Sequence, residues 1–153
     1  MSIIKARLPL LARHEGIWEG TYRFITPQLA VNDQYDFRIT VSFPDDGQGG
    51  ITYRQESAYR WPDGRTQHLS YDAQYRDDNG RAIVAFDGRI AGRMWELDAR
   101  TIYLTFGFAD QPGVEVCEMI QLAPNGRDRA RTWHWFNDSK LFQLTLVDER
   151  RVA

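Results

Sequence analysis

The side chains able to transfer protons or bind metals are few in this chain and widely spaced. None of the three histidines, His14, His68 and His134, lies at metal-ligand spacing to another histidine, a cysteine or a carboxylate, so we expect no metal. His134 stands between Trp133 and Trp135, and in an alternating strand either the histidine or both tryptophans face the interior. Burial favours the tryptophans. An inward His134 would be able to act as an acid–base group or as a haem ligand, and apart from that case we expect no cofactor.

Two carboxylates on apolar segments are the other candidates for proton transfer. Glu96 and Glu118 alternate with Trp95 and Met119, so either the acidic or the apolar member of each pair faces the interior. An inward carboxyl group would have its pKa raised by desolvation and would be poised to donate or accept a proton. The alternation is matched at least as well if both carboxylates face water while Trp95 and Met119 face the interior. The weak catalytic candidates are therefore His134, Glu96 and Glu118.

Turn signals divide the chain into short segments that would have to position these groups. "PDDGQGG" (44–50), "WPDGR" (61–65), "RDDNGR" (76–81) and "APNGRD" (123–128) contain Asp-Gly or Asn-Gly pairs, which are strong hairpin signals. The segments between turns run for about 7–11 residues, a typical strand length. A helix is expected over residues 3–14, although Pro9 disfavours a continuous one. We expect strands near residues 17–26, 34–43, 51–61, 66–76, 81–87, 89–97, 100–108, 114–122, 129–137 and 140–151.

Consecutive strands joined by tight turns predict an all-β fold, an antiparallel up-and-down meander. A long open sheet would leave unpaired edges that favour aggregation. Closure into a barrel of about 8–10 strands, with a short N-terminal helix, avoids those edges. Because no linker or repeat interrupts the 153 residues, we expect a single β-barrel domain over residues 1–153.

Alternation along the strands assigns the residues that face the interior. Apolar residues share one side in 35–43, beginning with Tyr35, and in 100–108, beginning with Ile102. In 140–151 the same rule assigns to the interior the row Phe142, Leu144, Leu146, Asp148 and Arg150.

Two neighbouring strands differ because their inward row is partly polar. In 51–61 and 66–76 this row carries Gln55, Ser57 and Gln67 among tyrosines. A buried amide without a partner costs ~1–3 kcal/mol, so ordered waters or Tyr–Gln hydrogen bonds satisfy these groups, or the lumen holds a ligand. In the second case we expect a ligand site in the lumen formed by Tyr22, Tyr53, Gln55, Gln67, Tyr71 and Trp133.

Composition restricts the partners and the location. The net charge of −2 shows no basic excess, so a nucleic acid is not expected. The single cysteine, Cys117, forms no disulfide within the chain, and no segment approaches the ~20 apolar residues of a membrane span. We therefore expect a cytoplasmic protein with no membrane partner. A homo-oligomer is left open, because a barrel without free edges would associate through exposed side chains.

The first strand carries a resemblance to a known superfamily. "GIW" at residues 16–18 resembles the Gly-x-Trp signature on the first strand of lipocalins and the wider calycin superfamily. The resemblance implies a barrel closed at its base by Trp18, with an arginine of the last strand lying across the indole ring in a cation–π contact. Arg150, in the inward row near the end of the chain, would take that role here. The resemblance also implies a small, mainly apolar ligand in the barrel.

Longer stretches resemble narrower groups. "YRQESAYRWPDGRTQ" (53–67) and "RTWHWFNDSKLFQLTLVDERR" (131–151) resemble a lipocalin-like family of bacterial, notably cyanobacterial, proteins without a settled activity, which implies fold more than function. "GRIAGRMWELDARTIYLTFG" (88–107) resembles, more weakly, the central segment of phenolic acid decarboxylases. The position of their catalytic glutamate corresponds to Phe106, so decarboxylation is not expected.

Three kinds of function are compatible with these features. We favour a binding barrel that holds a small aromatic or apolar molecule in its lumen. The alternative is a cofactor-independent enzyme, an isomerase, cyclase or lyase acting on such a molecule, which an inward glutamate or histidine would indicate. The third is an interaction module with a solid barrel, which an interior without voids would indicate.

Overall fold

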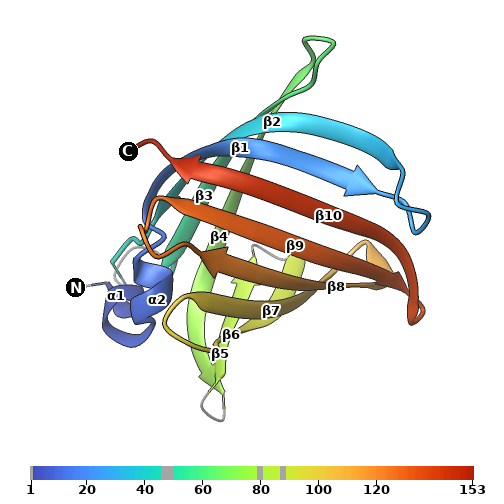
Figure 1. Cartoon of the computed structure of the whole chain (residues 1–153). Coiled ribbons are helices and arrows are strands. Elements are labelled where there is room, and N and C mark those ends of the chain that lie inside the picture. The colour runs from blue at the N-terminus through green and yellow to red at the C-terminus, as the bar shows by residue number, and fades with distance from the viewer. Residues whose placement is uncertain (1, 46–49, 79–80, 87–88) are drawn as a thin grey trace.

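Ten antiparallel strands make up most of the described part of the chain (Figure 1). The computed structural model describes residues 2–45, 50–78, 81–86 and 89–153. The strands are β1 (Gly16–Ile25), β2 (Val31–Ser42), β3 (Tyr53–Arg60), β4 (Thr66–Asp78), β5 (Arg81–Phe86), β6 (Ile90–Glu96), β7 (Thr101–Phe108), β8 (Gln111–Leu122), β9 (Asp128–Asn137) and β10 (Lys140–Arg151).

Each strand pairs with its neighbours in sequence, and β1 also pairs with β10, which closes the barrel. At this closure Trp18 lies opposite Arg151 and Tyr22 opposite Val147. The predicted all-β antiparallel meander, closed into a calycin-like barrel, is confirmed. The strands begin and end within a few residues of the predicted positions, and glycine shapes some of the turns between them. The turn after β3, for example, places Gly64 at a φ of 90°, which favours glycine.

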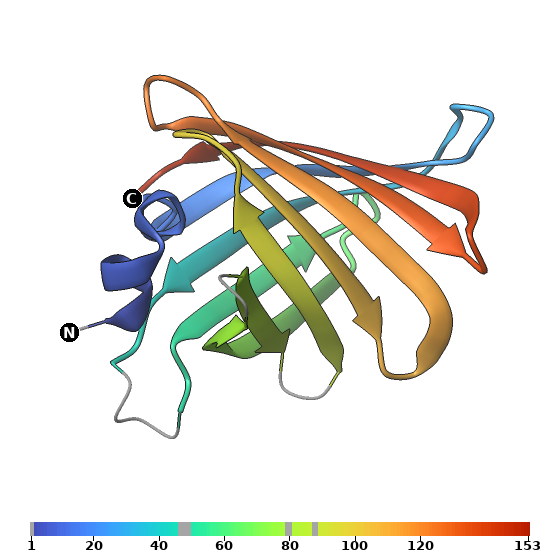
Figure 2. The ribbon, with the colours of Figure 1, turned by 90° about the horizontal axis from the view of Figure 1, so that it is seen from below.

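The N-terminal segment forms two short helices where one was expected. α1 (Ile3–Arg7) ends before Pro9, which begins α2 (Pro9–Ala12). Proline lacks the N–H that would continue α1, but it is well accommodated in the first turn of a new helix. Both helices lie at the end of the barrel where the two chain termini meet (Figure 2). There Ile4 and Leu10 are buried in the core, so the helices close that end.

The strand faces agree with the alternation rule on β2 and β7. Phe37, Ile39 and Val41 are buried, as are Ile102 and Phe106. These residues belong to the core cluster or line the lumen, so the inward rows of these two strands were predicted correctly.

On β10 the predicted inward row is wrong. The buried residues are Thr145, Val147 and Glu149, whereas Leu146 and Phe142 are 41% exposed. Leucines occupy the outer face of β10, while the inner face carries a glutamate that pairs with arginines inside the barrel. The more apolar side of the strand therefore does not mark the interior.

Candidate functional site

The closed end of the barrel is built around Trp18, which is completely buried. Its indole Nε1 donates a hydrogen bond to the backbone oxygen of His14 at 3.0 Å. The guanidinium carbons of Arg129 and Arg151 lie 4.1 and 4.8 Å from the centre of a Trp18 ring. The tryptophan closure implied by the lipocalin resemblance is therefore present, with two arginines in place of one.

The assignment of Arg150 to this closure is wrong. Its side chain is 75% exposed, and its Nε donates to Asp128 at 3.0 Å on the outer face. The error follows from the inverted faces of β10, because a shift of one residue exchanges inside and outside. Arg151, the next residue, approaches Trp18 where Arg150 was expected.

A network of buried charges lies next to Trp18 in the barrel interior, and the sequence did not predict it. Arg129 and Arg131 of β9 both form ion pairs with Glu149 of β10, and these three residues are 6–7% exposed. Arg131 Nε donates to Glu149 Oε2 at 2.8 Å, and its Nη2 donates to the hydroxyl of Tyr22 at 2.7 Å. Burial raises the pKa of Tyr22 well above its usual range, so this hydroxyl stays protonated. Charges held this way in an apolar interior fix the side chains in place.

His14 completes the network from the helical end. Its Nδ1 lies 2.8 Å from Nη1 of Arg129. Because arginine is only a donor, Nδ1 must be the acceptor and the proton must lie on Nε2. Burial, followed by the charge of Arg129, lowers the pKa of His14 to about 3, so the ring is neutral.

Glu118 of β8 is the carboxylate that the alternation left undecided, and it faces inward. The residue is 4% exposed, and its Oε2 lies 3.6 Å from Nη1 of Arg131. Burial raises its pKa to about 7, although the charge of Arg131 and the neighbouring Trp133 indole oppose the rise. Among the described residues, Glu118 Oε2 and Trp133 Nε1 have no hydrogen-bond partner.

Two neighbouring cavities occupy the lumen beside this network. The inner cavity has a volume of about 110 Å³ and reaches down to His14. The outer cavity has a volume of about 240 Å³ and is lined largely by aromatic side chains. The residues shared by both cavities are Gln55, Leu104, Phe106, Glu118 and Arg131. Glu118 and Arg131 therefore lie where the two cavities meet.

Aromatic rings form the wall of the outer cavity. Phe108 stacks on Trp135 with ring centres 5.6 Å apart, and Phe106 meets Trp133 edge to face at 5.6 Å. Tyr22 continues this wall, and its ring meets Trp133 edge to face at 5.9 Å. Such rings offer a ligand a large contact area without much loss of side-chain freedom.

The six residues predicted to bind a ligand all line the lumen. The outer cavity contains Tyr22, Gln55, Gln67, Tyr71 and Trp133, and the inner cavity contains Tyr53 and again Gln55. Gln67 is exposed, however, and lies at the edge of the site. Gln55 accepts a hydrogen bond from Tyr53 at 2.9 Å and donates one to Ser57 at 3.0 Å. These bonds satisfy the amide within its own strand, so its burial does not require a ligand.

Neither of the other two catalytic candidates lines the luminal cavities. Glu96 accepts hydrogen bonds from the backbone N–H of Leu10 at 2.7 and 3.3 Å, so it ties α2 to the barrel. His134 is exposed and lies opposite Cys117 on the outer face. An inward His134, and with it haem ligation from the lumen, is therefore wrong, because Trp133 and Trp135 take the inner face.

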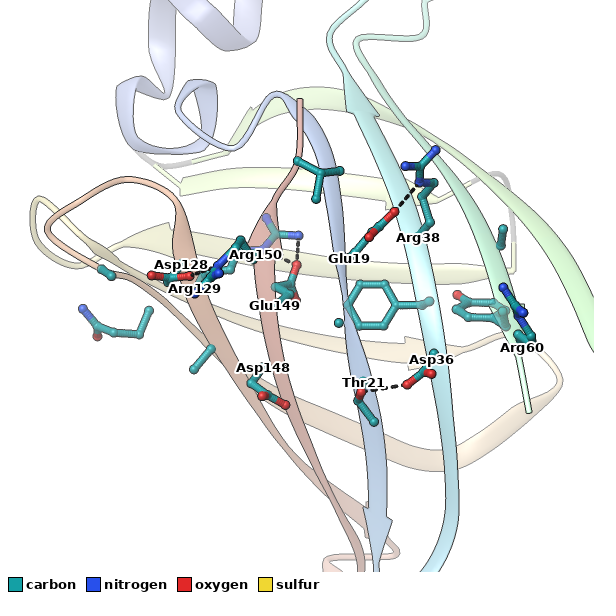
Figure 3. Close-up of a pocket in the computed structure, with 18 of the residues that line it drawn as sticks. Glu19, Thr21, Asp36, Arg38, Arg60, Asp128, Arg129, Asp148, Glu149 and Arg150 are labelled. Atoms are coloured by element: carbon teal, nitrogen blue, oxygen red, sulfur yellow. Dashed lines mark hydrogen bonds and ion pairs between the residues drawn. The ribbon is translucent and has the colours of Figure 1, made fainter. Parts of the chain in front are cut away.

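A broad concavity of about 1180 Å³ lies on the outer wall over β1, β2, β3, β9 and β10 (Figure 3). Its polar side chains are paired with one another: Arg38 forms an ion pair with Glu19 at 2.7 Å, and Thr21 donates a hydrogen bond to Asp36 at 2.8 Å. Exposed pairs of this kind contribute little to stability and leave few free groups for a ligand. We therefore take the lumen as the candidate site.

The described residues contain no cluster of three or more histidine, cysteine, aspartate or glutamate side chains suited to a metal ion. Neither described helix is long and apolar enough to cross a bilayer.

The closed meander, the tryptophan at its base and the partly polar lumen define a calycin-like barrel. Residues 7–153 match the family described as "Domain of unknown function (DUF3598), N-terminal", and the chain belongs to the DUF3598 family. The membership in a lipocalin-like barrel family that the sequence predicted is thus confirmed. A comparison with curated proteins gave no match.

Two solved structures are similar in fold. A DUF3598 protein of unknown function from Nostoc punctiforme PCC 73102 is 21% identical with a TM-score of 0.66, over 93% of this chain and 49% of that one. The present chain thus spans about half the length of that protein. The S-type phycobiliprotein lyase CPES from Guillardia theta is 14% identical with a TM-score of 0.76, over 100% of this chain and 94% of that one. At these identities the likeness shows the fold alone.

Proposed function

We propose that the protein binds a small aromatic or largely apolar molecule in the lumen of the barrel. The observation that carries this proposal is the aromatic-lined outer cavity of about 240 Å³. A solid interaction module would fill this volume with side chains, because protein interiors pack with few voids larger than a water molecule. Small-molecule sites typically combine such an apolar wall with a few placed polar groups, here Glu118, Arg131 and Trp133.

Blocking the cavity tests the proposal. Leu104 borders both cavities, so Leu104→Trp should fill the lumen, whereas Leu146→Trp adds the same side chain on the exposed face of β10. The hydrocarbon diphenylhexatriene fluoresces when it enters an apolar environment and has no polar atoms. We expect Leu104→Trp to weaken its binding at least about tenfold, and Leu146→Trp to leave it unchanged.

Thermal unfolding and circular dichroism establish that both variants are folded. Absence of probe binding to the unmodified protein, or equal binding by both variants, would contradict a luminal site.

The alternative, a cofactor-independent isomerase, cyclase or lyase, is favoured by one observation. Glu118 faces the cavities with its pKa raised to about 7, which suits a group that accepts and returns a proton near neutral pH. The carbon acid beta-tetralone tests this chemistry, because a base in the lumen would speed exchange of its acidic hydrogens for deuterium from D₂O. We expect faster exchange with the unmodified protein than with Glu118→Gln, followed by proton NMR; equal rates would exclude Glu118 as the base.

The S-type phycobiliprotein lyase named above shows that this fold also occurs in a lyase, but the chemistry here must be argued from the chain's own residues. We further propose a cytoplasmic location, consistent with Cys117 being a free thiol.

A further inference from the structure

Two buried polar atoms lie side by side in the lumen without hydrogen-bond partners among the described residues. They are the carboxylate oxygen Oε2 of Glu118 and the indole Nε1 of Trp133. The two residues are directly opposite each other on the paired strands β8 and β9, and both line the outer cavity. One atom is an acceptor and the other a donor.

Neither atom forms a hydrogen bond with the neighbouring charge network. The carboxylate oxygen of Glu118 forms an ion pair with Nη1 of Arg131 at 3.6 Å, which is too long for a hydrogen bond, while Nε and Nη2 of that guanidinium donate to Glu149 and Tyr22. The Trp133 indole interacts with the Glu118 carboxyl group closely enough to oppose the rise in its pKa, but this contact does not reach the geometry of a full hydrogen bond.

Buried polar groups are nearly always paired in folded proteins, so such a couple indicates a missing partner. That partner must supply both halves of the interaction at once, with a donor for Glu118 and an acceptor for Trp133. It must also be flat enough to lie against the neighbouring Phe106 ring, which meets Trp133 edge to face.

We propose that the lumen recognises a planar molecule containing a ring amide, whose N–H is donated to Glu118 and whose adjacent carbonyl accepts from Trp133. A ring amide holds its N–H and C=O on the same side, so one rigid group satisfies both protein atoms. The rest of the ring system then occupies the aromatic outer cavity. This inference rests on the proposed luminal binding function and specifies the class of ligand.

Calorimetric titration with carbostyril, a bicyclic ring amide, tests the inference at about pH 8, where Glu118 is ionised and accepts a hydrogen bond. N-methylcarbostyril is the matched probe, because it keeps the ring and the carbonyl but cannot donate. We expect carbostyril to bind at one site, and N-methylcarbostyril to bind at least about tenfold more weakly, the scale of a lost hydrogen bond to a charged acceptor.

Three variants assign the contacts. Glu118→Leu removes the acceptor and Trp133→Phe removes the donor while keeping an aromatic ring. His134→Leu, on the exposed face of the same strand, is the control. Carbostyril binding should weaken at least about tenfold in the first two variants and stay unchanged in the third, while diphenylhexatriene should bind to all of them.

The outcomes separate the inference from the function on which it rests. If diphenylhexatriene binds but carbostyril does not, or if methylation of its nitrogen makes no difference, the ring-amide inference is overturned and luminal binding stands. Equal carbostyril affinity in Glu118→Leu or Trp133→Phe would overturn it as well. If the hydrocarbon probe also fails to bind, the proposed function itself is wrong.

Discussion

Replacing Glu118 by glutamine should make the protein more stable in alkaline solution and change it much less in acid. The carboxyl group is buried, and its pKa rises from the usual 4.5 to about 7 on folding. Between these values the unfolded chain is ionised and the folded protein holds the proton. The stabilisation that Glu118 provides when protonated is therefore complete below pH 4.5 and is lost as the pH rises through about 7.

The magnitude follows from the difference between the two pKa values. From 4.5 to about 7, at 1.36 kcal/mol for each pH unit, ionisation of Glu118 costs about 3.4 kcal/mol of stability in the folded protein. About 2.5 kcal/mol of this cost develops between about pH 5 and about pH 8. Glutamine has a similar shape and no charge, so the variant should avoid the cost.

Urea unfolding of both proteins at about pH 5 and about pH 8 measures the effect as the pH dependence of the difference in unfolding free energy. The buried His14, whose pKa is lowered to about 3, makes stability fall with acid in both proteins, so its contribution cancels. A difference between the proteins that is the same at both pH values would refute the reasoning, because Glu118 would then ionise like an exposed carboxylate.

Four further substitutions test the closed end of the barrel by chemical unfolding. Trp18→Ala should cost ~3–5 kcal/mol, as for other buried aromatic residues, and a loss below about 1 kcal/mol would contradict its role in closure. Arg151→Ala should lower the free energy of unfolding by about 1–2 kcal/mol, because Arg151 contacts Trp18 and also donates to the backbone oxygen of Glu15 at 2.9 Å. Arg150→Ala should change it by no more than about 0.5 kcal/mol. A larger loss for Arg150→Ala than for Arg151→Ala would restore the assignment of Arg150 to the Trp18 closure. Glu149→Leu should cost ~3–5 kcal/mol, since both buried arginines lose their carboxylate, and unchanged stability would show that the ion pairs are replaceable.

The fold was predictable because it depends on local signals that a sequence displays directly. Turn pairs such as Asn-Gly mark where strands end, and the Gly-x-Trp triplet around Trp18 indicates the superfamily. The lumen was harder to predict because some of its inward-facing side chains are charged. The rule that the more apolar side of a strand faces the interior therefore fails there, as it does on β10. Glu149 is buried only because Arg129 and Arg131 face it from the next strand, and that pairing is not visible within β10 alone.

Part of this network could have been inferred from the same strand. Once Trp133 is assigned to the interior, alternation along β9 places Arg131 and Arg129 there too, and two buried arginines require a carboxylate partner. His14 had no comparable signal. It lies between a helix and the first strand, where no alternation applies, and its contact with Arg129 joins residues far apart in the chain.

The pairing of β1 with β10 has a consequence for how the protein is made. The second neighbour of β1 is β10, so the barrel cannot close until β10 has left the ribosome. Contacts so distant in sequence slow folding, because the entropy of closing the long loop must be lost before the contacts form. Until then β1 exposes an unpaired edge, and the buried arginines lack their glutamate. The newly synthesised barrel is therefore expected to be most prone to aggregation just before β10 emerges.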